Sequence, residues 1–80
     1  MNLNRAFALR LSKLLAEKNI SKYRFEKETG LSHSALRYIF NEVNNDVRFS
    51  TIVKTCIALD VTITEFFNDE LFNLDNLEVE

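Results

Sequence analysis

The segment KYRFEKETGLSHSALRYIFN, residues 22–41, most constrains the fold, because it has the pattern of two short helices joined at the only glycine of the chain. Gly30 is expected to leave the first helix in the left-handed conformation, where a Cβ would clash. Ser32 can then accept hydrogen bonds from the free amides of the next turn as an N-cap. Two helices joined by so short a corner predict a helix-turn-helix.

The composition favours an all-α fold in a single domain. The 80 residues include no proline and one glycine, which leaves little turn chemistry for a β-sheet. The one cysteine cannot form an internal disulfide, and no Cys/His spacing suits a metal ion. No apolar run approaches the roughly 18 residues of a membrane span. We therefore expect a cytoplasmic protein with no membrane contact, no metal or other cofactor and no small-molecule ligand.

Five helices are predicted from apolar spacing and capping signals. The first four are expected at Leu3–Lys18, Lys22–Thr29 after a Ser21 cap, His33–Asn41 and Phe49–Leu59. The first should bury a stripe of Leu3, Phe7, Leu11, Leu14 and Leu15 and stop at a left-handed Asn19; the fourth should bury Phe49, Ile52, Cys56 and Leu59. The fifth should begin at a capping box of Thr62 and Glu65, with Val61 and Phe66 as a hydrophobic staple.

The charge is divided unevenly along the chain. Residues 1–59 hold all ten Lys and Arg and five acidic residues, whereas residues 60–80 hold seven acidic residues and no basic one. A basic body is compatible with phosphate binding despite the overall net charge of −2. The acidic, partly apolar tail of residues 70–80 leaves three interpretations open: it contacts a second subunit or partner protein, folds back over the core, or covers the basic face.

The outer face of the third helix carries residue types that contact base edges. At 100° per residue, Leu36, Ile39 and Phe40 share one arc that should be buried. On roughly the opposite arc lie Ser34, Arg37 and Asn41, with Tyr38 at one edge and His33 at the N-terminal end. Arg can donate two hydrogen bonds to guanine and Asn suits adenine, whereas Ser or His can contact base or phosphate. A short surface helix is also polar on its outer side without any such role.

Two further groups of residues are candidates for phosphate contacts. Lys22 and Tyr23 begin the second helix, whose free amides and positive dipole favour an anion. Asn44 and Asn45, in the loop after the third helix, could reach neighbouring phosphates. The alternatives are a solvated lysine and ordinary turn-forming asparagines.

Three segments, LSKLLAEKNIS, FEKETGLSHSALRYIFN and FSTIVKTCIALDVTITEFF, resemble the lambda-repressor-like family, the Cro/C1-type (XRE family) helix-turn-helix proteins of phages and bacteria. The resemblance covers residues 11–69 and implies a five-helix DNA-binding domain over residues 1–69, followed by an acidic tail over residues 70–80. It further implies a transcriptional regulator, by expectation a repressor, that binds double-stranded DNA as a homodimer with its third helix in the major groove. By position, Lys22 matches a frequent DNA-contacting glutamine, and Ser32, His33, Ser34 and Arg37 match base- and phosphate-contacting positions.

The chain departs from the family pattern in three places. Glu26 stands where alanine is strongly preferred, so its carboxylate must tilt out to water or find a partner. Leu15 and Phe40 stand where many members place an Arg–Glu ion pair, so an apolar contact is expected instead. The loop after Asn41 lacks the usual glycine and proline.

Two other classes of function have partial support in the sequence. The same fold could serve as a protein-interaction module or an antitoxin-like regulator, with the apolar residues of the tail, or Leu9 of the first helix, contacting a partner. An enzyme would require His33 and Cys56 to meet as a base and a nucleophile. Cys56 lies on an apolar stripe and is expected in the core, so we predict no enzymatic activity and no catalytic residue.

Overall fold

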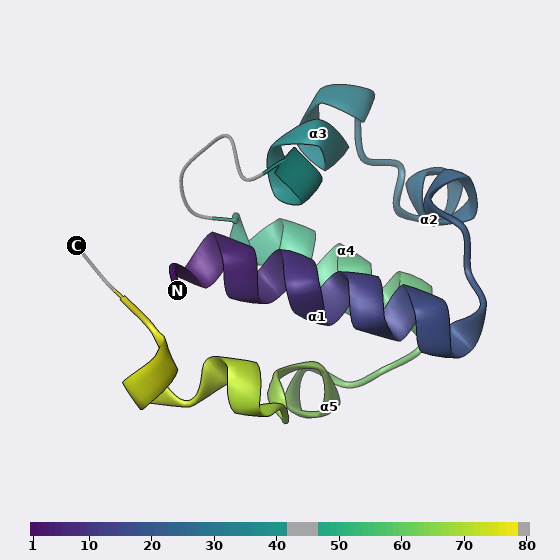
Figure 1. Cartoon of the computed structure of the whole chain (residues 1–80). Helices are drawn as coiled ribbons and strands as arrows, with labels where there is room; N and C mark the ends of the chain where they lie inside the picture. Colours follow the sequence, from purple (N-terminus) through teal and green to yellow (C-terminus); the bar gives the residue numbers. More distant parts are fainter. Residues whose placement is uncertain (42–46, 79–80) are drawn as a thin grey trace.

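The computed structural model describes residues 1–41 and 47–78, apart from the side chain of Asn41. Five α-helices lie in this part of the chain: α1 (Leu3–Lys18), α2 (Lys22–Thr29), α3 (His33–Asn41), α4 (Phe49–Leu59) and α5 (Ile63–Phe67). Two 3-10 turns follow, η1 (Glu70–Phe72) and η2 (Leu74–Asn76). All five predicted helices are present (Figure 1), so the all-α fold class is confirmed.

The N-terminal caps explain where the helices begin. Ser21 Oγ accepts a hydrogen bond from the amide of Arg24, as predicted, and Asn2 Oδ1 does the same for α1. The predicted capping box of α5 is also present: Thr62 Oγ1 accepts from the Glu65 amide, and Glu65 Oε1 accepts from the Thr62 amide. Because these partners are three residues apart at most, the signals are readable from local sequence.

Three helices end at left-handed residues. Asn19 after α1 and Gly30 after α2 have φ values of 56° and 68°, which confirms both predicted stops. Asp60 ends α4 in the same conformation, with φ 55°. A left-handed residue turns the chain sharply away from the helix axis, so short loops suffice between the helices.

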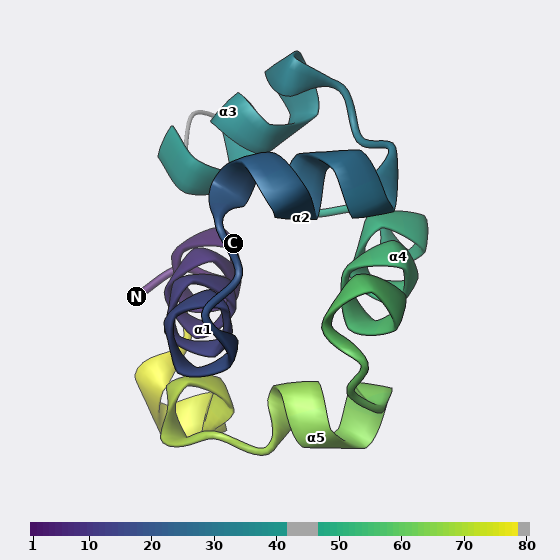
Figure 2. The ribbon, with the colours of Figure 1, turned by 90° about the vertical axis from the view of Figure 1, so that its right-hand side faces the viewer.

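The helices surround one core, as Figure 2 shows: α1 and α4 are seen nearly end-on, with α2 above them, α5 below them and α3 at the top over α1. α3 contacts α1, whereas α2 and α5 contact α4. The largest fully buried apolar side chains come from four different helices: Leu11, Phe25, Leu59 and Phe66. Buried Leu36 and Ile39 attach α3 to the same cluster, so the core fixes the position of the helix-turn-helix.

The described part of the acidic tail folds back against the body. The ring of Phe72 contacts those of Phe66 and Phe67, with centroids 6.2 and 4.7 Å apart. Asn2 and Glu78 form an isolated parallel bridge, in which the Glu78 amide donates to Met1 O at 2.8 Å. Of the three interpretations of the tail, the structure therefore shows the folded-back segment.

Two predicted core residues are exposed. Leu3 lies at the start of α1 and Phe49 at the start of α4, where its side chain is 69% exposed. Each begins its helix, beyond the region that the other helices cover. The apolar spacing correctly gave the buried sides of α1 and α4, but it could not show where along each helix the packing begins.

Candidate nucleic-acid interface

The rotational setting of α3 is the one predicted from its sequence. Leu36 and Ile39 are buried, and Phe40 is half-buried against the core cluster. Ser34, Arg37 and Tyr38 are exposed. Because the apolar face is held in the core, the polar face is presented to solvent in one fixed orientation.

The corner between α2 and α3 is fixed by side-chain hydrogen bonds. Thr29 Oγ1 donates to Phe25 O at 2.8 Å and accepts from the Leu31 amide at 3.3 Å. Ser32 Oγ accepts from the Ala35 amide at 3.1 Å, which confirms its predicted role as the N-cap of α3. Ser32 therefore starts the helix, and its exposed position also leaves it accessible to a phosphate.

A groove of about 590 Å³ runs between α3 and the start of α4. Its α3 side includes the predicted residues Ser34 and Tyr38, beside Ser32 of the corner. Its α4 side includes residues that were not predicted as site residues: Arg48, Ser50, Thr51 and Lys54. The structure thus places a basic element, at the start of α4, beside α3.

The start of α4 is suited to an anion. Arg48, the N-cap residue, supplies no side-chain capping hydrogen bond. The first amides of α4 are therefore not satisfied by a cap, and the helix dipole adds partial positive charge there. One signal in the sequence could have indicated this site: Arg48 is a basic residue directly before a predicted helix. Apolar periodicity alone could not show that Arg48 lies beside Ser34.

The start of α2 carries the other predicted phosphate contacts. Lys22 is its first residue, and its Nζ lies 4.3 Å from the centroid of the Phe40 ring. Tyr23 is exposed, with Lys27 Nζ 5.0 Å from its ring centroid. Both predicted residues are accessible to a ligand.

Glu26, the main departure from the family pattern, has a half-exposed carboxylate near His33. Its side chain is 35% exposed, and its Oε1 lies 3.9 Å from Nδ1 of the 79%-exposed His33. The carboxylate therefore tilts towards solvent and a possible partner, as the sequence required. Leu15 and Phe40, the other departure, belong to the same apolar cluster.

The remaining predicted site residues cannot be placed. Asn44 and Asn45, together with the side chain of Asn41, lie outside the described residues. Asn41 itself is the last residue of α3.

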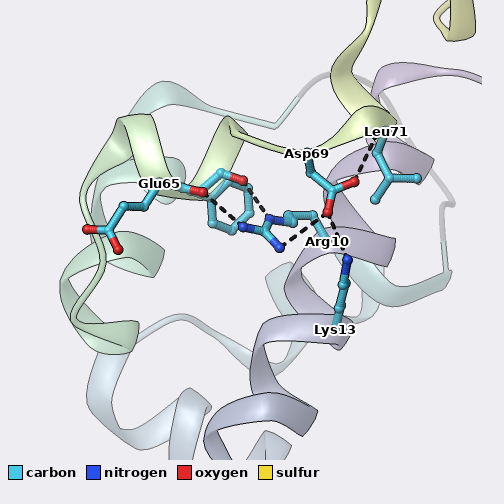
Figure 3. Close-up of polar contacts among 6 residues, drawn as sticks. Arg10, Lys13, Glu65, Asp69 and Leu71 are labelled. Carbon is cyan, nitrogen blue, oxygen red and sulfur yellow. Dashed lines mark hydrogen bonds and ion pairs between the residues drawn. The ribbon is translucent and has the colours of Figure 1, made fainter.

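Some basic residues are paired with carboxylates of the protein and others are not. Arg10 and Lys13 of α1 pair with Asp69, as Figure 3 shows, and Arg24 pairs with Glu28 within α2. The hydrogen bond from the Leu71 amide, followed by that from Lys13, lowers the pKa of the Asp69 carboxyl. By contrast, Arg37, Arg48 and Lys54 form no ion pair among residues 1–41 and 47–78. Among the described residues, no carboxylate therefore offsets the charge of these cations near α3.

The described tail lies away from α3. Figures 1 and 2 both place η1 and η2 beside α1 and α5, on the other side of the molecule from α3. Residues 70–78 therefore do not cover the exposed polar face of α3 in this structure, contrary to one of the three interpretations of the tail.

Other chemistry has little structural support in the described region. Cys56 is buried, and burial raises the pKa of its thiol, whereas His33 is exposed and no hydrogen bond joins the two. Residues 1–41 and 47–78 contain no group of three potential metal ligands. None of their helices has the length and apolar character required to span a bilayer.

An N-capped helix with a fixed polar face, a glycine corner before it and exposed basic residues beside it together define a helix-turn-helix protein of the DNA-binding class. A family model for the Cro/C1-type helix-turn-helix DNA-binding domain matches residues 10–71. The chain therefore belongs to the Cro/C1-type family, as the resemblance implied. No curated protein and no solved structure matched the chain.

Proposed function

We propose that this protein is a sequence-specific regulator of transcription that inserts α3 into the major groove of double-stranded DNA. The observation that carries the proposal is the fixed polar face of α3: Ser34 and Arg37 are exposed on a helix whose Leu36 and Ile39 are buried. The planar guanidinium of Arg37 can donate two hydrogen bonds to guanine. Ser34 and His33 contribute shorter contacts to base edges or phosphates.

Two basic elements would hold the backbone on either side of α3. The first is the start of α2, with Lys22 and Tyr23. The second is the start of α4, where Arg48 and Lys54 line the groove that contains Ser34 and Tyr38. Phosphate contacts from both would set the register of α3 without specifying sequence. Asn41, Asn44 and Asn45 remain proposed contacts of the connecting segment.

We further propose that the regulator is a homodimeric repressor of the bacterial or phage-infected cytoplasm, with residues 1–69 as the DNA-binding unit and residues 70–80 as a stabilising tail. An exposed apolar stripe on α4 supports the dimer. Phe49 and Ile57 are 69% and 74% exposed and flank Val53 at four-residue spacing, so they share one side of the helix. An isologous dimer requires one such patch on each copy.

The proposed function is tested by selecting bound duplexes from a randomised DNA library at about 150 mM salt. The wild-type chain should enrich one motif, and a palindrome with half-sites about 10 base pairs apart would indicate a dimer. A Ser34→Ala/Arg37→Ala variant should lose the motif while its helix content stays unchanged. The matched control, Leu74→Ser, changes an exposed side chain of η2 and should recover the same motif.

The second candidate function is a protein-interaction module or antitoxin-like regulator, favoured by the same exposed stripe on α4. Failure of the folded wild-type chain to enrich any motif would contradict sequence-specific DNA binding. In that case the exposed stripe on α4, and not α3, would be the surface expected to bind a partner protein.

A further inference from the structure

Lys22 and Phe40 connect the two outer ends of the helix-turn-helix. Gly30 joins the end of α2 to the region where α3 begins, whereas Lys22 is the first residue of α2 and Phe40 lies in the last turn of α3. The Lys22 ammonium lies 4.3 Å from the centroid of the Phe40 ring, within the range of a cation–π interaction. The ring is half-buried against the core cluster, so the surface on which the ammonium rests is itself held in place.

The other two basic residues of α2 are Arg24 and Lys27. Arg24 is paired with the carboxylate of Glu28, which offsets its charge. Lys27 Nζ lies 5.0 Å from the centroid of the Tyr23 ring, but that ring is itself 66% exposed. Lys22 takes part in none of the ion pairs of the described residues. An aromatic ring orients an ammonium through its quadrupole and carries no net charge. Lys22 is therefore held in position while its full positive charge remains available to a phosphate.

From this geometry we propose that Phe40 is a positioning residue that holds the Lys22 ammonium at the α2 N-terminus for contact with a DNA phosphate. The inference rests on the proposed DNA binding and assigns to α3 a second role besides base contact. The α2 amides and the Lys22 ammonium then act on one phosphate together. Because Phe40 belongs to α3, the backbone contact is coupled directly to the recognition helix.

The test uses the affinity of the full chain for a short mixed-sequence duplex at about 50 mM salt, where sequence-independent phosphate contacts dominate. Phe40→Leu keeps an apolar side chain against the core but removes the ring, and should weaken binding about threefold. Phe40→Tyr keeps the ring and should restore wild-type affinity. In a Lys22→Ala background, Phe40→Leu should weaken binding no further. Lys18→Ala, which removes another exposed lysine charge at the last residue of α1, is the charge-matched control for Lys22→Ala.

A second readout does not depend on DNA. In the NMR spectrum of the free protein, the side-chain methylene protons of Lys22 should be shifted upfield by the ring current of Phe40. The shift should persist in Phe40→Tyr and disappear in Phe40→Leu. Random-coil shifts in the wild-type protein would overturn the proposal, even if Phe40→Leu fails to fold.

The two proposals fail in different ways. The positioning role is wrong if the wild-type chain binds duplex DNA and Phe40→Leu binds it equally well. It is also wrong if Phe40→Leu lowers the DNA affinity as much in the Lys22→Ala background as in the wild type. In both cases the proposed function stands. If the folded wild-type chain binds no duplex while the ring-current shift is present, the proposed function is wrong and the positioning role falls with it.

Discussion

Arg10 Nη1 lies 3.3 Å from Asp69 Oδ2, and this ion pair joins two residues that are 59 positions apart in the sequence. The same guanidinium donates from Nε to Phe66 O at 2.7 Å and from Nη2 to Glu65 O at 2.9 Å. These carbonyls lie at the end of the five-residue helix α5, where Glu65 O also accepts a hydrogen bond from the amide of the C-cap residue Asn68 at 3.3 Å. Arg10 therefore caps α5 from α1 and anchors the tail, although its sequence position assigned it to the basic body.

Arg10→Met should lower the free energy of unfolding by about 1–3 kcal/mol, because it removes charged hydrogen bonds to two main-chain oxygens and to Asp69. Urea unfolding measures the change. Arg10→Lys should recover only part of the loss, since an ammonium lacks the planar fork of a guanidinium. Equal stability of Arg10→Met and wild type would contradict the capping role.

The stability contributed by Asp69 should depend on pH in one direction. Its pKa lies below the ordinary value of 3.8, chiefly because the Leu71 amide and Lys13 bond to the carboxylate. Folding therefore favours the ionised form, and the stabilisation is present above that ordinary value and lost as pH falls through the lowered folded value. Asp69→Asn should cost about 1–3 kcal/mol at neutral pH.

The difference between wild type and Asp69→Asn should shrink in acid unfolding measurements below about pH 4. Asp75→Asn, at an exposed position on η2, is the matched control and should match wild type throughout. A difference that stayed constant with pH would mean that the carboxylate charge does not matter.

Gly30 should be required for conformational rather than steric reasons. Its φ is +68°, yet a Cβ placed there would have no heavy atom within 4 Å. Gly30→Ala should therefore lower stability by about 1–2 kcal/mol, the cost of a left-handed alanine. Gly30→Asn should cost less, because asparagine tolerates this conformation. Thermal unfolding of the two variants distinguishes conformational strain from steric clash. If a clash were the cause, Gly30→Asn would lower the stability more than Gly30→Ala, because its side chain is larger.

Arg37→Ala and Lys54→Ala should weaken DNA binding in different ways. Arg37 is expected to contact a base, so its loss should cost about 1–3 kcal/mol on the selected motif and relax the preference at one base pair. Lys54 faces the groove beside α3 and is expected to contact a phosphate, so its loss should weaken all duplexes evenly. Titrations on cognate and random DNA give both values. Equal losses on both duplexes for Arg37→Ala would exclude base contact.

Ile57→Asp should favour the monomer, because it places a charge within the apolar stripe of the proposed subunit contact. The side chain is 74% exposed, so the substitution should leave the fold intact. Analytical ultracentrifugation measures the association, with Leu74→Asp as a control at another exposed apolar position. Unchanged association would place the dimer surface elsewhere, and a monomeric wild type would remove the dimer altogether.

The five α-helices and the outer face of α3 could be predicted from the sequence, because their signals act between near neighbours. Ser21, Ser32 and Thr62 cap amides only three residues away, and Gly30 changes direction through its own φ. The spacing of Leu36 and Ile39 fixed which face of α3 is buried.

Which distant residues meet depends on tertiary packing and could not be predicted from the sequence. Arg10 donates to Phe66 O and pairs with Asp69, and Arg48 and Lys54 of α4 line one groove with Ser34 of α3. Phe49, predicted for the core, is 69% exposed at the first position of α4. Such outcomes depend on how whole helices pack around a shared core, since side-chain partners separated by more than 50 residues leave no periodic signal between them.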